Sequence, residues 1–311
     1  MKYVRLLQEL RREDLSLAGG KGANLGELVL AGMKVPQGFV LTVDGYRRCI
    51  TNVYLPKINV HDLAALEAVT SKIQMEIENV YLPDEVMAEV LEAYRRMCCP
   101  KVAVRSSATA EDLPGASFAG QQETYLNIQG EDAVLDAIKK CWASLWAPRA
   151  VQYRSLQGFG ESEVALAVVI QEMAPHEVAG VVFTVNPLVN DSCELIINAA
   201  KGVGEALVQG EIIPDQWLAR RPDGAVLKFT PAPQKGQSSS LLPHTGRPAR
   251  GCLTSQQVRE LACLCLRIEK HFNGVPQDIE WSYGAGEFYL LQSRPITALK
   301  LGNAKRKTLM A

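Results

Sequence analysis

The sequence predicts a protein of mixed α and β structure with two lobes. Helical and strand patterns alternate along the chain, and short apolar runs of strand length lie between turn signals. At about 150 residues per domain as a loose prior, a chain of 311 residues is long enough for two domains. With 47% hydrophobic and 22% charged residues, it can bury a large core and is too apolar for intrinsic disorder.

Charge balance and hydropathy argue against two other classes of protein. With 33 Lys and Arg residues against 34 Asp and Glu residues, the net charge of −1 excludes nucleic-acid binding by bulk charge. The longest apolar run covers residues 164–170, whereas a transmembrane helix needs about 20 residues, so we expect no membrane span. The first residues lack the apolar core and cleavage site of a signal peptide, and we therefore expect a cytoplasmic protein.

The 8 cysteines are expected to be free and mostly buried thiols of a reducing compartment. Cys98 and Cys99 are adjacent, and Cys263 and Cys265 are separated by one residue within a helical pattern. No C-x-x-C pair occurs, so the spacing of zinc ligands or of a redox pair is absent.

The individual elements follow from apolar spacing and turn signals. Helices are expected where apolar residues recur at helical spacing, at residues 21–31, 62–79, 84–97, 131–146 and 148–157. A turn that leads into a strand is expected at residues 35–42. Strands are expected in short apolar runs, at residues 101–105, 164–171, 181–184, 194–198, 278–283 and 288–292. Residues 106–121 are expected to form a polar loop, and the Pro-, Gly- and Ser-rich stretch 221–251 a surface loop or mobile connection.

The first segment that carries chemistry is a glycine-rich turn at the start of a helix, Gly-Gly-Lys-Gly-Ala-Asn-Leu-Gly at residues 19–26. Glycines let the backbone approach phosphate oxygens, a helix N-terminus favours anions, and Lys21 adds a positive charge. The segment matches neither the Walker A pattern nor the dinucleotide-binding pattern. It is either a phosphate cradle or a flexible loop that caps a helix and carries a solvated lysine.

The second segment carries Arg105 from the end of a buried strand into a loop rich in Ser, Thr and Gly, which continues through Gly120 to Thr124. A guanidinium there can hold two phosphate oxygens, and such a loop can wrap a polyphosphate and then open. The alternative is a surface loop in which Arg105 pairs with Glu111 or Asp112.

The third segment is a hairpin whose two strands contain residues 278–281 and 289–295. If the strands pair, Glu280 faces Gln292, and Arg294 lies on the same face as Gln292. Mg²⁺ is typically bound by one or two protein oxygens together with substrate phosphates, and a neighbouring arginine can neutralise charge on a group in transfer. The alternative is a polar trio on a solvated face of the sheet.

Six blocks occur in the order found in a known family, from about Leu17 to Thr297. They read GGKGANLGEL, VPQGFVLT, VAVRSSATAEDLPGASFAGQQETYLNI, VIQEMAPHEVAGVVFTVNP, GVGEALVQGEIIPD and DIEWSYGAGEFYLLQSRPIT. The chain thereby resembles the N-terminal nucleotide-binding region of the phosphoenolpyruvate synthase and pyruvate phosphate dikinase family, which includes the rifampin phosphotransferases. The resemblance implies an α+β ATP-grasp fold in which ATP lies between two lobes, at residues 1–171 and 172–298, followed by a basic tail or linker at 299–311.

The resemblance also implies a reaction and a set of site residues. ATP would phosphorylate a histidine on a swivelling domain through its β-phosphate, leaving AMP and inorganic phosphate, with Lys21, Arg105 and Arg294 as catalytic residues. By this resemblance Lys21 and Arg105 would hold phosphates, and Gly120 and Thr124 would line the loop around the phosphates. Gln171 would contact adenine. Glu280 and Gln292 would bind Mg²⁺, and Arg294 would contact the transferring group.

The histidine that would accept the phosphoryl group is expected outside this chain. The four histidines, His61, His176, His244 and His271, lie outside any loop of the kind that surrounds the phosphorylated histidine in the family, so we expect none of them to be the carrier. The carrier domain is expected either in the remainder of a longer enzyme or in a separate subunit, as in the phenylphosphate synthases. The alternative function is a nucleotide-dependent interaction or sensor module without turnover, against which the combined phosphate and metal residues argue.

Overall fold

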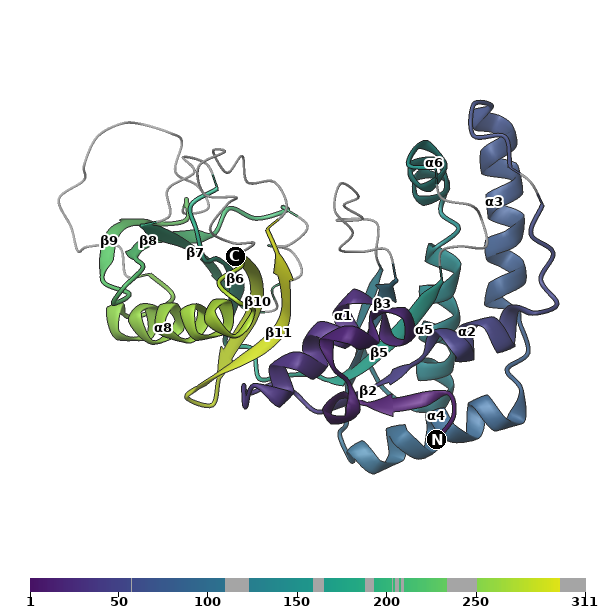
Figure 1. Cartoon of the computed structure of the whole chain (residues 1–311), viewed down its shortest axis with the longest axis horizontal. Helices are drawn as coiled ribbons and strands as arrows, with labels where there is room; N and C mark the ends of the chain where they lie inside the picture. The colour runs from purple at the N-terminus through teal and green to yellow at the C-terminus, as the bar shows by residue number, and fades with distance from the viewer. Residues whose placement is uncertain are drawn as a thin grey trace. The chain divides into compact units, whose positions relative to one another are not determined.

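The computed structural model describes residues 1–56, 58–109, 123–158, 165–187, 193–202, 204, 207, 210–233 and 251–296. The chain divides into two compact units, Met1–Met173 and Ala174–Ala311. Each unit has its own antiparallel sheet with helices packed on it (Figure 1), so the predicted α+β class is confirmed.

The first unit contains a five-stranded sheet with the strand order β1-β2-β5-β3-β4. Its strands are β1 (Val4–Leu6), β2 (Gly38–Leu41), β3 (Val102–Ala108), β4 (Thr124–Ile128) and β5 (Leu166–Glu172). The central strand β5 is buried along nearly all of its length. An apolar run without alternation, Leu-Ala-Val-Val-Ile in β5, is typical of a strand that is covered on both faces.

Two helices of the first unit, α3 and α6, start at residues with helix-initiating chemistry. Its described α-helices are α1 (Leu15–Leu30), α2 (Val43–Ile50), α3 (Leu63–Glu78), α4 (Asp84–Met97), α5 (Glu131–Ser144) and α6 (Pro148–Leu156). The side chain of Asp62 accepts a hydrogen bond from the backbone N–H of Ala65 at 3.1 Å and caps α3. Pro148 opens α6, where the missing N–H of proline costs nothing. Helix α1 packs on β3 and β5 (Figure 1).

The second unit contains a six-stranded sheet with the strand order β11-β10-β6-β7-β8-β9. Its strands are β6 (Val178–Phe183), β7 (Glu194–Lys201), β8 (Asp215–Arg220), β9 (Val226–Thr230), β10 (Gln277–Gly284) and β11 (Glu287–Pro295). Helix α8 (Ser255–His271) packs on this sheet (Figure 1) and begins with a capping box between Thr254 and Gln257.

The two faces of the six-stranded sheet differ in polarity. On one face Ile279, Ile197 and Trp217 are buried, and α8 covers this face with its own apolar side chains. Neighbouring residues along each strand point to the opposite face. That second face, which we call the polar face, carries Glu280 and Gln292 at one edge of the sheet.

Several elements differ from the sequence prediction. Helix α1 begins at Leu15 instead of residue 21, because two helical segments join at Gly19, whose φ is 67°. Strand β3 continues to Ala108, so Ser106 and Ser107 belong to the sheet and not to the loop, since Val168 and Ala167 of β5 pair with them. Strand β9 lies inside the predicted loop 221–251, because Val226–Thr230 pairs with β8. The sequence prediction missed β1, α2, β4 and β8 entirely.

The prediction about the cysteines is confirmed only in part. All 8 cysteines are free, as predicted, but Cys49, Cys141 and Cys265 alone are buried, so the prediction of mostly buried thiols is wrong. No helix in the described part of the chain is long and apolar enough to cross a membrane.

Candidate functional site

The glycine-rich segment of the first unit is bent at Gly19 and held against β3. A Cβ atom at Gly19 would lie 2.1 Å from the backbone oxygen of Ser107, so only glycine allows the two backbones to approach this closely. Lys21 follows in the second helical segment of α1, and its side chain is buried, with 7% exposed.

Ser107 fixes the bend in α1 through two hydrogen bonds. Its hydroxyl donates to the backbone oxygen of Ala18 at 2.8 Å and accepts from the backbone N–H of Gly22 at 3.1 Å. The hydroxyl therefore satisfies one N–H in the first turn of the second helical segment, as an N-cap residue would. The sequence predicted that this helix N-terminus favours phosphate, but the N–H of Gly22 already donates to Ser107. Ser107 itself was visible in the sequence only as one hydroxyl of a polar loop.

Arg105 and Thr124 lie directly opposite each other on β3 and β4, and Arg105 also pairs with Val169 of β5. Directly paired residues project to the same face of a sheet. Val169 in turn pairs with Val40, against which Gly22 of α1 packs. The structure therefore brings Arg105 and Thr124 onto the sheet face that carries α1 and Lys21. Arg105 is buried, with 7% exposed, and Thr124 is half-buried.

Gln171 belongs to this same face, because it lies two residues from Val169 on β5 and is diagonal to Arg105. Its side chain is 2% exposed, and Nε2 donates to the backbone oxygen of Pro36 at 3.3 Å. The amide is thus oriented by the turn before β2. Its assignment to adenine stays a prediction. Gly120, assigned to the phosphate loop, lies outside the described residues.

In the second unit the hairpin β10–β11 has the predicted pairing. Glu280 lies directly opposite Gln292, and Asp278 lies directly opposite Arg294. The spacing of two along each strand places all four side chains on the polar face. The expected juxtaposition of Glu280, Gln292 and Arg294 is therefore present, within one unit and on adjacent strands.

Asp278 is a site residue that the sequence reasoning missed. Its Oδ2 accepts hydrogen bonds from Nε of Arg294 and forms an ion pair with Nη2, both at 2.8 Å. Burial raises the pKa of Asp278, the charge of Arg294 opposes this shift, and the nearby Glu280 adds to it. The signal in the sequence was the Asp-x-Glu spacing, which places two carboxylates on one face of a strand.

The donor set on the hairpin fits a hard divalent cation. Glu280 offers carboxylate oxygens and Gln292 an amide oxygen, both of them ligands that Mg²⁺ accepts. Gln292 is 4% exposed, so its position is fixed by packing. Among the described residues no group of three or more His, Cys, Asp or Glu side chains could hold a metal by itself. A cation here would therefore need ligands from its substrate as well, as Mg²⁺ commonly does.

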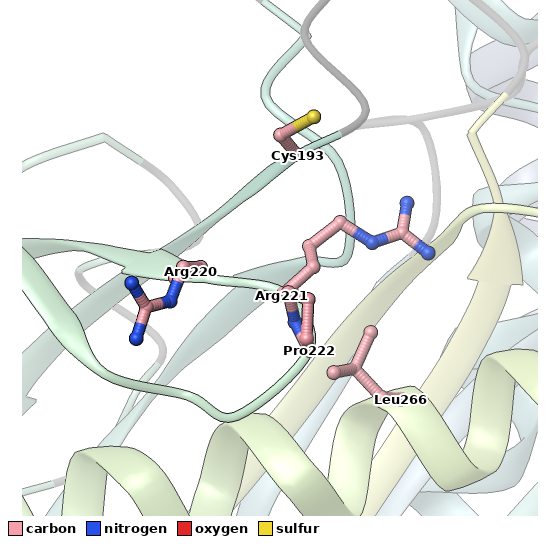
Figure 2. Close-up of a pocket in the computed structure, with 5 residues that line it drawn as sticks. All are labelled: Cys193, Arg220, Arg221, Pro222 and Leu266. Atoms are coloured by element: carbon pink, nitrogen blue, oxygen red, sulfur yellow. The ribbon is translucent and has the colours of Figure 1, made fainter.

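A pocket of about 660 Å³ in the second unit is lined by none of the predicted site residues. Its lining residues are Cys193, Arg220, Arg221, Pro222 and Leu266 (Figure 2). The two guanidinium groups point in different directions, and each is paired with a carboxylate, Arg220 with Asp223 and Arg221 with Glu269. Both charges are already neutralised by the protein, so the pocket adds no unpaired cation to the candidate site.

The described histidines are exposed or held at a turn. His61 and His271 are exposed, and Nδ1 of His176 lies 2.8 Å from the backbone oxygen of Ala174. His244 lies outside the described residues. That none of the four carries a phosphoryl group stays a prediction.

Comparison with known proteins gives a family match over most of the chain. Residues 15–311 match the model described as "Pyruvate phosphate dikinase, AMP/ATP-binding domain". A probable phosphoenolpyruvate synthase of Methanocaldococcus jannaschii is 42% identical over 99% of this chain and 28% of its own length. A rifampicin phosphotransferase of Bacillus subtilis is 40% identical over 94% of this chain and 36% of its own length. The chain thus spans well under half the length of these relatives.

Solved structures give only a distant likeness. A D-alanine-D-alanine ligase from Helicobacter pylori is 12% identical with a TM-score of 0.33, over 78% of this chain and 58% of that one. A similarity of this size is too weak to assign a function.

Proposed function

The chain belongs to the pyruvate phosphate dikinase AMP/ATP-binding domain family, and from this premise we propose that it binds ATP with Mg²⁺ and donates the β-phosphoryl group to a histidine. The histidine belongs to a swivelling domain, in a longer chain or in a separate subunit. A ring nitrogen of that histidine forms the new bond to phosphorus, and the bond between the β-phosphorus and the oxygen that stays with AMP breaks. Water attacks the γ-phosphorus, and the bond from the γ-phosphorus to the oxygen that bridges it to the β-phosphorus breaks, so the products are AMP, inorganic phosphate and a phosphohistidine.

The observation that carries this proposal is the direct pairing of Glu280 with Gln292 beside Arg294. A carboxylate and an amide oxygen on adjacent strands match the ligands of Mg²⁺ bound to nucleotide phosphates, and bound Mg²⁺ would neutralise phosphate charge. Arg294, held by Asp278, keeps a fixed positive charge near the group in transfer. In the first unit, Lys21 and Arg105 supply two more cations to phosphate oxygens.

The proposed arrangement is that of an ATP-grasp fold, in which one lobe holds phosphates and the other holds the metal. Lys21, Arg105, Gly120 and Thr124 belong to the phosphate-binding lobe and Gln171 to the adenine contact, whereas Glu280, Gln292 and Arg294 belong to the metal-binding lobe. The proposed boundaries are residues 1–171 and 172–298.

Calorimetry and thermal unfolding with Mg-ATP test the proposal. A ligand that binds only the folded state stabilises it by mass action, by about 2.7 kcal/mol at a concentration one hundred times Kd. Lys21→Ala and Arg105→Ala should each reduce this shift strongly, because each removes a charge-assisted contact. Arg149→Ala provides a matched control, since Arg149 is an exposed arginine paired with Glu123. Absence of ATP binding in the presence of Mg²⁺ would refute the proposed function.

A further inference from the structure

A second polar pair lies on the polar face of the six-stranded sheet, in line with the hairpin residues. Glu280 pairs with Val181, Val181 pairs with Asn198, and Asn198 pairs with Gln216. Cross-strand pairing places all of these side chains on one face. The row that begins with Gln292 and Glu280 on β11 and β10 therefore continues to Asn198 on β7 and Gln216 on β8.

The two amides form one hydrogen-bonding unit. Nε2 of Gln216 donates to Oδ1 of Asn198 at 3.0 Å, and both side chains are half-buried. An amide has two N–H donors and an oxygen with two lone pairs, so the pair retains both a donor and an acceptor for a ligand. Within the described part of the chain, neither side chain makes another hydrogen bond.

Folding alone does not explain an asparagine at this position. Asparagine is depleted in strands, and the residues next to Asn198 in β7 are Ile197 and Ala199, both buried on the face that α8 covers. Ile196 lies two residues from Asn198 on the same face of β7, and it is apolar and buried. An apolar side chain is therefore tolerated on this face, next to the position of Asn198. An amide pair that costs strand propensity and keeps unused hydrogen-bonding groups is typical of a ligand contact.

Resting on the proposed function, we infer that the Asn198–Gln216 pair binds the ribose diol of the nucleotide. Two strand spacings, or about 9.5 Å, separate the Asn198 position from the Glu280 position in the row. In Mg-ATP the metal lies at the polyphosphate end and the ribose at the other end of that polyphosphate. A vicinal diol can accept a hydrogen bond from the free amide N–H and donate one to the free amide oxygen, which matches what the pair offers.

Titration calorimetry with ATP, 2′-deoxy-ATP and 3′-deoxy-ATP, each with Mg²⁺, tests this inference. Loss of one neutral hydrogen bond weakens binding by about three- to tenfold. The unaltered protein should therefore bind at least one deoxynucleotide three- to tenfold more weakly than ATP. Asn198→Ala and Gln216→Ala should bind ATP more weakly by a similar factor and should no longer distinguish ATP from that analogue.

Thr230→Val is the matched control, because Thr230 continues the same row on the exposed edge strand β9. It should keep the discrimination unchanged. The two alanine variants lie on different strands, so a folding defect in one leaves the other informative, and thermal unfolding without nucleotide checks both.

Equal affinity of the unaltered protein for all three nucleotides would overturn the inference and leave the proposed function intact. Discrimination that survives in both alanine variants would overturn it equally. A protein that binds none of the three nucleotides would overturn the proposed function itself.

Discussion

At the scale of single residues, the geometry of the glycine-rich segment depends on one missing side-chain atom. Gly19 has a φ of 67°, and its Cα faces the backbone of Ser107 with no room for a Cβ. The bend in α1, the hydroxyl of Ser107 and the position of Lys21 two residues later are therefore coupled. A substitution at Gly19 would therefore act on the proposed phosphate binding through this backbone and not through lost charge.

Gly19→Ala should lower the free energy of unfolding by about 2–4 kcal/mol, as measured by chemical denaturation, because backbone strain and a steric clash add. Gly32→Ala separates the two causes, since Gly32 has a φ of 70° but nothing within 4 Å of a Cβ. The control should lose only about 1 kcal/mol. Equal losses for the two variants would show that contact with Ser107 contributes nothing.

At the scale of elements, the hairpin β10–β11 places its side chains through strand register. A slip of one residue would move Glu280 from the polar face to the face covered by α8. The register is held by the partners of β10 on both sides, because β6 and β11 each pair with it. Ser293 adds a buried hydrogen bond from its hydroxyl to Oε1 of Gln277 at 2.8 Å.

Glu280→Ala should weaken the Mg²⁺-dependent part of ATP binding by about ten- to a hundredfold, as expected for a charged contact worth about 1.5–3 kcal/mol. Binding measured without Mg²⁺ should change much less, because the adenine contact that we propose for Gln171 is separate from the metal ligands. Glu287→Ala is the control on the same hairpin, since Glu287 is exposed near its turn. If Glu280→Ala retains the Mg²⁺ dependence of the unaltered protein, the metal assignment is wrong.

A second element, the edge strand β1, is anchored by a carboxylate of α4. Glu89 accepts hydrogen bonds from the backbone N–H groups of Lys2, Tyr3 and Val4, at 2.7, 2.8 and 3.1 Å. Partial burial by itself would raise the pKa of Glu89, but these three donors outweigh it and hold the pKa below the usual 4.5. The ionised carboxylate is therefore the form that docks the strand.

Stability should depend on pH through this contact. The unfolded chain binds a proton at Glu89 more readily than the folded one, so the contribution is fully present above pH 4.5 and is lost as pH falls through the lowered pKa. Denaturation at a series of pH values should show Glu89→Gln less stable than the unaltered protein at pH 7, with the difference shrinking below pH 4.5. Glu92→Gln, on the same helix in an exposed pair with Arg96, should change little at any pH. A difference that is independent of pH would contradict the charged anchor.

At the scale of the whole molecule, the proposed reaction needs a nucleophile from elsewhere. His61 and His271 are exposed, and His176 lies at a turn beside Gly284, four residues along β10 from Glu280. In-line transfer from the β-phosphate requires an imidazole held against it. The chain by itself should therefore bind ATP and turn it over very slowly.

Adding a histidine-bearing swivelling domain from a relative, in trans or by fusion, should yield AMP, phosphate and an acid-labile phosphohistidine on the added domain. Transfer from ATP labelled at the β-phosphate, resolved by chain, measures this. Lys21→Ala or Arg294→Ala should abolish the label, and His176→Gln should leave it. Label on a histidine of this chain would refute the assignment of the phosphohistidine to another domain. ADP in place of AMP would indicate transfer of the γ-phosphate.

Local sequence pattern was most informative where contacts are local. The helix at residues 84–97 was predicted with both of its ends correct. The register that places Glu280 opposite Gln292 followed from the turn between two alternating strands. Strand β8 and strand β9 were missed because their short, partly polar runs become strands only by pairing with β7 and with each other.

The sequence by itself determined the family, the mixed α and β class and most of the candidate residues, because spacing and residue type are read along the chain. Only the tertiary structure decided that Ser107 caps the second segment of α1, that Asp278 holds Arg294, and that Asn198 and Gln216 extend the row of Glu280. Each of these contacts joins residues from different strands or from a helix and a strand. The reason is that sheet pairing and packing bring distant segments together, and no local period of 2 or 3.6 encodes which segments meet.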